Sequence, residues 1–174
     1  ENKVKNLTLD VTNRQVPEEL LNHFRSLLFE KKFQCVISEG EEALSNYKNP
    51  ASIYNIMGIA NASLKQAREA ETCYKKAIEL EPDFFKPYSN LGISLKDQGK
   101  LEEAIDAFNG ALKIQPSSAE VHNNLGIVFQ EEGKLNEAVK AFEKALSIQP
   151  NYASAHENIG NTLSDQGHLK RAEA

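Results

Sequence analysis

Apolar and small residues recur along the chain at a spacing of 34 residues, with polar residues between them. The repetition is clearest in residues 85–150. Three segments there return almost unchanged: Asn90-Leu91-Gly92 as Asn124-Leu125-Gly126, Ala107-Phe108 as Ala141-Phe142, and Ile114-Gln115-Pro116 as Ile148-Gln149-Pro150. An internal repeat of this length is typical of stacked helical arrays, in which each unit packs only on its neighbours.

Each repeat is predicted to form two helices. The first helix ends near Gly99 or Gly133, because glycine adopts the left-handed backbone conformation that stops a helix at little cost. The second helix ends at Pro116 or Pro150, because proline cannot continue a helix. The pattern therefore predicts antiparallel helix pairs joined by short turns.

Small residues are expected where two helices approach closely, and larger apolar side chains fill the spaces between them. In residues 85–118 the small residues are Gly92, Ala104 and Ala111, and the larger ones are Tyr88, Leu91, Leu101, Phe108 and Leu112. A single repeat buries too little apolar area to fold alone. Stability is therefore expected to come from contacts between repeats.

These residues resemble the tetratricopeptide repeat, a helix–turn–helix unit of 34 residues. The family's pattern of two aromatic positions, Leu-Gly, two alanines and a proline is matched by Tyr88, Leu91, Gly92, Ala104, Phe108, Ala111 and Pro116. The resemblance implies an all-α fold, a right-handed superhelical α-solenoid of antiparallel helix pairs.

The repeat frame also divides the chain. Residues 1–16 lack helical periodicity and are predicted to be an N-terminal linker or arm. Repeats follow at 17–50, 51–84, 85–118, 119–152 and, truncated, 153–174. The first of them is degenerate, because His23-Phe24 replaces Leu-Gly and Gly40 replaces an aromatic residue. The last repeat is expected to turn at Gly167 and to stop one turn into its second helix. Its first helix would then leave apolar surface uncovered, and the chain is expected to be part of a longer protein.

The second repeat departs from the pattern at its inter-helix turn, where Lys65 replaces glycine. A left-handed conformation at Lys65 would cost about 1 kcal/mol relative to glycine. Lys65→Gly is therefore expected to raise the melting temperature.

Composition narrows the possible partners. A formal net charge of −5 argues against nucleic acid, whose phosphates require clustered Lys and Arg. No apolar run approaches the roughly 18 residues that a membrane span needs, so no membrane insertion is expected.

Cys35 and Cys73 stand outside any motif, and the expected location is the cytoplasm. The glycosylation sequons at Asn6 and Asn61 are interpreted as chance matches.

No catalytic constellation or cofactor site is predicted. Of the four histidines, His122 and His156 occupy the same position in successive repeats. Adjacent repeats lie roughly 10 Å apart, which is too far for these two side chains to share a metal ion. The chain also lacks a glycine-rich phosphate loop, a nucleophile elbow and Cys–His metal spacing. It is therefore expected not to be an enzyme.

First helices line the concave face in arrays of this family, so the resemblance implies a groove for a protein segment or extended peptide. The candidate groove residues are Asn55, Ile59, Asn90, Ile93, Asn123, Asn124, Ile127, Glu131, Asn158 and Asn161. Carboxamides both donate and accept hydrogen bonds, so a row of them could pair with a peptide backbone. Alternatively, the asparagines stabilise the repeats themselves, and the isoleucines pack between helices.

Charge changes along this predicted groove. The third repeat carries Lys86, Lys96 and Asp97, and the later repeats carry Glu120, Glu131, Glu157 and Asp165. The later part should disfavour acidic peptides, unless these are simply solvated surface charges. Family members that hold chaperone C-termini use a clamp of Lys and Arg on successive first helices, and this chain lacks those cations. Chaperone-tail binding is therefore not expected.

Three functions are compatible with the sequence. The first is an interaction scaffold that binds a peptide in its groove. The second is the substrate-recruiting arm of a larger glycosyltransferase or sulfotransferase, because the asparagine row resembles that of O-linked N-acetylglucosamine transferases and the repeats resemble those of bacterial proteins of these kinds. The third is self-association through the uncovered last helix.

Overall fold

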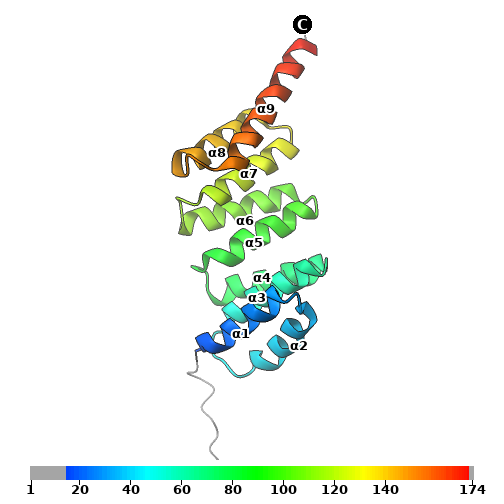
Figure 1. Ribbon diagram of the computed structural model, residues 1–174, viewed down its shortest axis with the longest axis vertical. Coiled ribbons are helices and arrows are strands. Elements are labelled where there is room, and N and C mark those ends of the chain that lie inside the picture. Colours follow the sequence, from blue (N-terminus) through cyan, green and yellow to red (C-terminus); the bar gives the residue numbers. More distant parts are fainter. Residues whose placement is uncertain (1–14, 173–174) are drawn as a thin grey trace, which may run out of the picture. The chain divides into compact units, whose positions relative to one another are not determined.

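The computed structural model describes the backbone of residues 15–172 and side chains as far as Gly167. This part of the chain consists of helices without strands, which confirms the predicted all-α repeat fold (Figure 1). The predicted arm lies outside the described residues except for Gln15 and Val16. The helices are α1 (Glu18–Phe29), α2 (Phe33–Leu44), α3 (Ala51–Ser63), α4 (Ala67–Leu80), α5 (Phe85–Asp97), α6 (Leu101–Ile114), α7 (Ala119–Glu131), α8 (Leu135–Ile148) and α9 (Ala153–Ala172).

The turns inside the first four repeats all use one repeat position. Gly99 and Gly133 have φ angles of +72° and +75° there, as the sequence predicted. Lys65 occupies the same position with a φ of 61°, so it does adopt the left-handed conformation considered above. Lys31, in the degenerate first repeat, does the same with a φ of 59°. Two of the four turns therefore carry a residue that pays a steric cost for this conformation.

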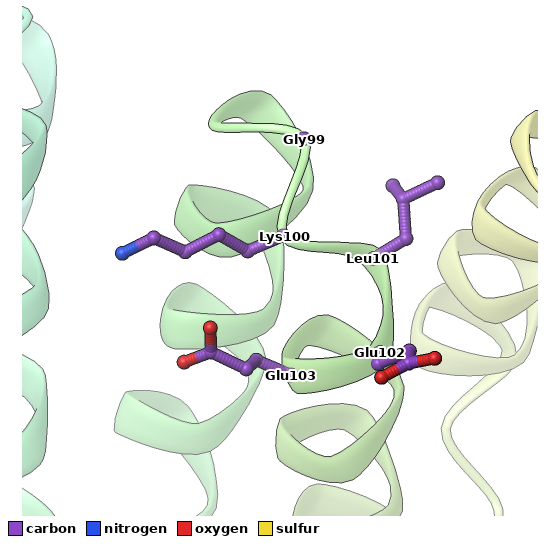
Figure 2. Close-up of a pocket in the computed structure, with 5 residues that line it drawn as sticks. All are labelled: Gly99, Lys100, Leu101, Glu102 and Glu103. Carbon is purple, nitrogen blue, oxygen red and sulfur yellow. The ribbon is translucent and has the colours of Figure 1, made fainter.

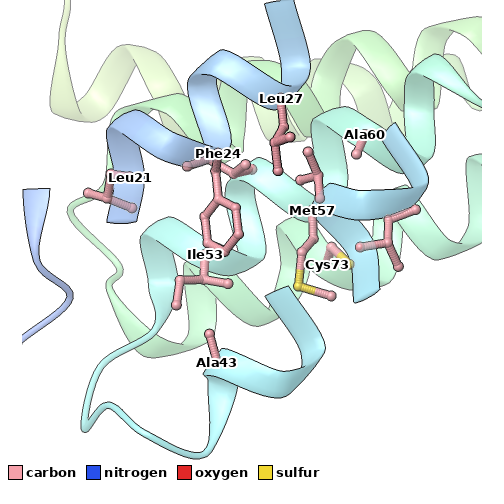
Figure 3. Close-up of a cluster of buried hydrophobic side chains, with 11 residues drawn as sticks. Leu21, Phe24, Leu27, Ala43, Ile53, Met57, Ala60 and Cys73 are labelled. Atoms are coloured by element: carbon pink, nitrogen blue, oxygen red, sulfur yellow. The ribbon is translucent and has the colours of Figure 1, made fainter. Parts of the chain in front are cut away.

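The chain divides into two compact units, residues 1–82 and 83–174. In the first unit, α1, α2 and α3 surround a cluster of buried apolar side chains (Figure 3). Phe24 is completely buried in this cluster. A Cβ atom at Gly40 would lie 2.7 Å from Cγ of Met57, so the Met57 side chain packs directly on this glycine. Gly40 stands at the repeat position where other repeats have an aromatic ring. The flexible thioether of Met57 suits the irregular space beside it.

The second unit contains α5 to α9. Gly92 of α5 lies directly under the ring of Phe108 in α6, because a Cβ atom at Gly92 would come 2.5 Å from Cε1 of that ring. Gly126 of α7 and Phe142 of α8 have the same relationship. Only glycine leaves room for a ring this close to the helix backbone. The repeated spacing of these two pairs thus fixes how α6 packs on α5 and how α8 packs on α7.

Helix α9 corrects one prediction. It runs without a break from Ala153 to Ala172 and passes through Gly167, so the predicted turn at Gly167 is wrong. A turn is favourable only if the following residues can pack back as a second helix. In the described residues no second helix follows Gly167 to pack back on α9. Continuing the first helix keeps the backbone hydrogen bonds satisfied instead.

Candidate peptide-binding face

The first helices of the second unit lie in a row, since α5 contacts α7 and α7 contacts α9. Each helix carries an asparagine, then an isoleucine or asparagine three residues later, then an acid four residues after that. This spacing places the three side chains on one side of a helix. We call this surface the α5–α7–α9 face, and it comprises Asn90, Ile93, Asp97, Asn124, Ile127, Glu131, Asn158, Asn161 and Asp165.

The side chains of the α5–α7–α9 face are partly or fully accessible. The two isoleucines, Ile93 and Ile127, are half-buried. The first residue of the pattern on each helix, Asn90, Asn124 or Asn158, is also half-buried. The three acids, Asp97, Glu131 and Asp165, are exposed. The face therefore combines half-buried amides and apolar groups with an exposed acidic margin.

Two of the predicted groove residues lie below the surface. Asn123 is only 3% exposed and Asn55 only 4% exposed. Asn55 and Asn123 occupy the same repeat position, one residue before the position of Asn90, Asn124 and Asn158. Since successive helix residues point about 100° apart, a shift of one position turns a side chain from the surface into the helix interface. Ile59, also predicted, is half-buried on α3 in the first unit.

Asn123 is held by a neighbouring first helix. Nδ2 of Asn158 in α9 donates a hydrogen bond of 3.1 Å to Oδ1 of Asn123 in α7. This bond uses one of the two N–H groups of Asn158 and leaves its second N–H group and its oxygen as further hydrogen-bonding groups. At the α5–α7 contact the residue equivalent to Asn123 is Ser89, which has a shorter side chain and is also buried. No side-chain hydrogen bond joins Asn124 to another residue in the described part of the chain.

Open hollows in the second unit involve other residues. One of about 320 Å³ is lined by Gly99, Lys100, Leu101, Glu102 and Glu103, at the start of α6. Figure 2 shows the side chains of Lys100 and Glu103 extending to the same side of this turn. Another, of about 610 Å³, is lined by Asp106, Asn109, Leu112 and Lys113. Neither set includes a residue of the α5–α7–α9 face, and both are charged, open surfaces.

The two repeat-related histidines have structural partners. Nε2 of His122 lies 3.0 Å from the carbonyl oxygen of Pro116, and Nε2 of His156 lies 2.8 Å from that of Pro150. A carbonyl oxygen only accepts, so Nε2 must carry the proton in both rings. Each bond ties the start of a first helix to the proline that ends the preceding repeat. Among the side chains of residues 15–167, no group of three or more His, Cys, Asp or Glu residues is arranged to hold a metal ion.

The geometry defines the class of protein first. Antiparallel helix pairs repeat every 34 residues, and α4, α6 and α8 each seat an aromatic ring on a glycine of the preceding first helix. This arrangement makes the chain an α-helical repeat protein. A family model described as the tetratricopeptide repeat matches residues 83–151 and 117–174, more than half of the chain, and a second model, described as a TPR repeat, matches residues 58–99. The chain belongs to the tetratricopeptide-repeat family.

Individual relatives agree with this assignment. Tetratricopeptide repeat protein 37 of Xenopus laevis is 28% identical over 82 residues, which is 47% of this chain and 5% of that protein. The structure of MamA from residue 41 to its end, from Desulfovibrio magneticus RS-1, has a TM-score of 0.77 at 22% identity and covers 89% of each chain. The first TPR of Spaghetti (RPAP3), bound to the HSP90 peptide SRMEEVD, has a TM-score of 0.65 at 21% identity and covers 67% of this chain and 93% of that one. At these identities the two structures show a shared fold.

None of the helices in the described range is long and apolar enough to cross a membrane.

Proposed function

We propose that the chain is a protein-interaction scaffold that binds an extended peptide across the α5–α7–α9 face. The observation that carries this proposal is the threefold repetition of amide, apolar or amide, and acidic side chains on three helices that contact one another in series. A surface with a regular spacing suits a ligand with a regular spacing of its own. An extended peptide backbone is such a ligand.

Each kind of side chain has a defined part in this interaction. The carboxamides of Asn124 and its repeat equivalents donate to and accept from peptide amides, which reads the backbone rather than the sequence. Ile93 and Ile127 contact apolar side chains of the ligand. The exposed carboxylates of Glu131 and Asp165 favour basic peptides and repel acidic ones. The ligand is therefore expected to be a basic or neutral segment with some apolar residues.

A similar solved structure supports the use of this fold for holding a peptide, since the Spaghetti repeats were solved with the peptide SRMEEVD. That peptide has more acidic than basic residues, whereas the margin of the α5–α7–α9 face here is acidic. We therefore do not extend the chaperone-peptide ligand to this chain. The charge of the face favours a different class of peptide.

An array of unstructured peptides with varied charge and apolar content tests the proposal. The informative variant is Asn124→Ala, because its side chain is half-buried and its removal breaks no internal hydrogen bond. Asn109→Ala on α6 is the matched control, since it deletes an exposed carboxamide away from the face. We expect wild type and control to bind the same basic peptides, and Asn124→Ala to weaken them by about 0.5–1.5 kcal/mol. Equal binding by all three proteins, or a preference for acidic peptides, would refute the proposal.

Two broader expectations from the sequence stay predictions. A role as the recruiting arm of a larger glycosyltransferase or sulfotransferase would use the same face to hold a polypeptide substrate. A cytoplasmic location fits two free thiols, Cys35 and Cys73, in a reducing compartment.

A further inference from the structure

Two large apolar side chains protrude near the turns of the first unit. Phe29, the last residue of α1, is 90% exposed, and Leu64, which directly follows α3, is 38% exposed. Exposed cations lie close to them in the sequence: Lys31 follows Phe29 by two residues, Lys65 is next to Leu64, and Arg68 comes three residues later. We call these five residues the basic edge.

The two turns lie on the same side of the first unit. Helices α1 and α3 contact each other. Figure 3 shows that they run in the same direction, from Leu21 to Leu27 and from Ile53 to Ala60. Their C-terminal ends, and the turns that follow, therefore lie next to each other. The apolar and cationic side chains of both turns thus belong to one surface.

The cations of the basic edge have no acidic partner among the described residues. Lys32, the next lysine in the first turn, is different, because its Nζ lies 2.7 Å from Oε2 of Glu30. No ion pair in the described part of the chain includes Lys31, Lys65 or Arg68. Their charges are therefore available to an anion outside the protein.

The second unit has a different chemistry at the same repeat positions. Asp97 and Glu131 stand where the first repeat has Phe29, and glycine stands where the first two repeats have Lys31 and Lys65. Both lysines hold a left-handed backbone conformation, which costs free energy that glycine avoids. Backbone strain of this kind is often found at binding sites. A ligand that contacts the two side chains would account for lysine at these turns.

We propose that the basic edge docks on the surface of an anionic lipid bilayer. The ring of Phe29 enters the interface between headgroups and acyl chains, and Leu64 follows it less deeply. The three cations bind the anionic headgroups. The contact is peripheral and inserts side chains only. It belongs to the first unit, so it is separate from the α5–α7–α9 face.

The shape of the basic edge favours a bilayer over a protein partner. A stable protein interface buries roughly 800 Å² on each partner around an apolar core. The basic edge offers one protruding ring and one partly exposed leucine, and the nearby Ser63 and Gln66 are polar and exposed. A fluid bilayer needs no pocket, because its lipids rearrange around a single ring and anionic headgroups gather at cations.

Phe29→Trp gives a direct readout, because the chain contains no tryptophan. The variant would be titrated with vesicles of equal parts phosphatidylserine and phosphatidylcholine. We expect the emission of the introduced indole to shift to the blue at low salt, and to stay unchanged at high salt or with phosphatidylcholine alone. No shift with the mixed vesicles would overturn the proposal. A shift caused by a soluble peptide of glutamate and leucine, with the vesicles inactive, would identify an acidic protein segment as the ligand and would also overturn it.

Cosedimentation of further variants with the mixed vesicles locates the contact. Lys31→Gly/Lys65→Gly should bind at least about fivefold more weakly, because two cations are lost, although glycine relieves the backbone strain at both turns. Lys48→Gln/Lys113→Gln removes the same charge from exposed lysines elsewhere and should bind like the unaltered chain. Phe29→Ser should weaken binding about threefold or more, because the apolar anchor is lost. Circular dichroism checks that each variant folds. Equal binding by all of them would place the contact outside the basic edge and contradict the proposal.

Discussion

Nδ2 of Asn158 donates a hydrogen bond to Oδ1 of Asn123 over 3.1 Å, although the two residues are 35 positions apart in the sequence. The bond joins the first helices α9 and α7 and satisfies the oxygen of a carboxamide that is almost completely buried. Buried polar groups in proteins nearly always have such a partner. Asn123 and Asn158 thus have different surroundings. Asn123 lies in the interface between helices, whereas Asn158 lies at the surface and its side chain reaches into that interface.

A double-mutant cycle measures this bond. Asn158→Ala should destabilise the fold by about 1 kcal/mol, because Oδ1 of Asn123 loses its partner inside the protein. Asn123→Ala should cost a similar amount, and the double variant should cost less than the sum of the two. Urea denaturation of the four proteins should give a coupling free energy of roughly 0.5–1.5 kcal/mol. Strictly additive effects would show that the two carboxamides do not stabilise each other.

Glycine substitutions at the left-handed lysines should stabilise the chain. Lys65, with a φ of 61°, and Lys31, with a φ of 59°, occupy the position that is glycine in the third and fourth repeats. Lys65→Gly and Lys31→Gly should each raise the free energy of unfolding by up to about 1 kcal/mol, since glycine has no Cβ to clash. Lys65→Ala is the control and should give no gain, because alanine keeps the Cβ. A lower melting temperature for Lys65→Gly would mean that the greater entropy of glycine in the unfolded chain is the larger effect.

Alanine at two equivalent glycines should have opposite effects. Gly92→Ala places a Cβ atom 2.5 Å from Cε1 of Phe108, so the ring must shift and the fold should lose about 1–3 kcal/mol. Gly160→Ala meets nothing within 4 Å and should gain up to about 1 kcal/mol from better helix propensity. Thermal denaturation of the two variants checks the pair. Destabilisation by Gly160→Ala would show that another group occupies the space beside Gly160.

The Tyr74 hydroxyl makes the first unit sensitive to alkaline pH. Burial raises the pKa of Tyr74 above its ordinary value of 10.0. The folded state therefore favours the neutral phenol, and this contribution to stability is present below pH 10 and is lost as the pH rises further. Burial raises the pKa of the Cys73 thiol in the same direction. Tyr74→Phe, which copies the phenylalanine of the third and fourth repeats, should reduce the loss of stability in urea between about pH 9 and pH 11. An identical pH dependence for both proteins would contradict this explanation.

Much of the fold could be predicted because its determinants are local and repeated. Gly99 and Gly133 end first helices through their own backbone freedom, and the 34-residue spacing identifies equivalent positions. The turn predicted at Gly167 is wrong because a glycine permits a turn but does not cause one. The turns at Gly99 and Gly133 also depend on a second helix that packs back, which is a nonlocal interaction.

The candidate face was harder to predict from sequence. The repeat frame places Asn123 and Asn124 on the same helix, but it does not say which of the two is buried. Their difference depends on how far α7 is rotated against its neighbours. The pairing of Asn158 with Asn123 likewise depends on the side-by-side packing of α7 and α9. The turn at Lys31 contains no glycine that would indicate it in the sequence. Its position in the repeat frame nevertheless indicates the turn.

Amide chemical-shift mapping locates the bound peptide on the chain residue by residue. The protein would be labelled with ¹⁵N and titrated with the tightest basic peptide from the array. We expect the largest shift changes on the first helices, at Asn124, Ile127 and Glu131, while Asn109 and its neighbours on α6 change little. The largest changes on α6 or α8, with α7 unaffected, would contradict the proposal that the α5–α7–α9 face holds the peptide.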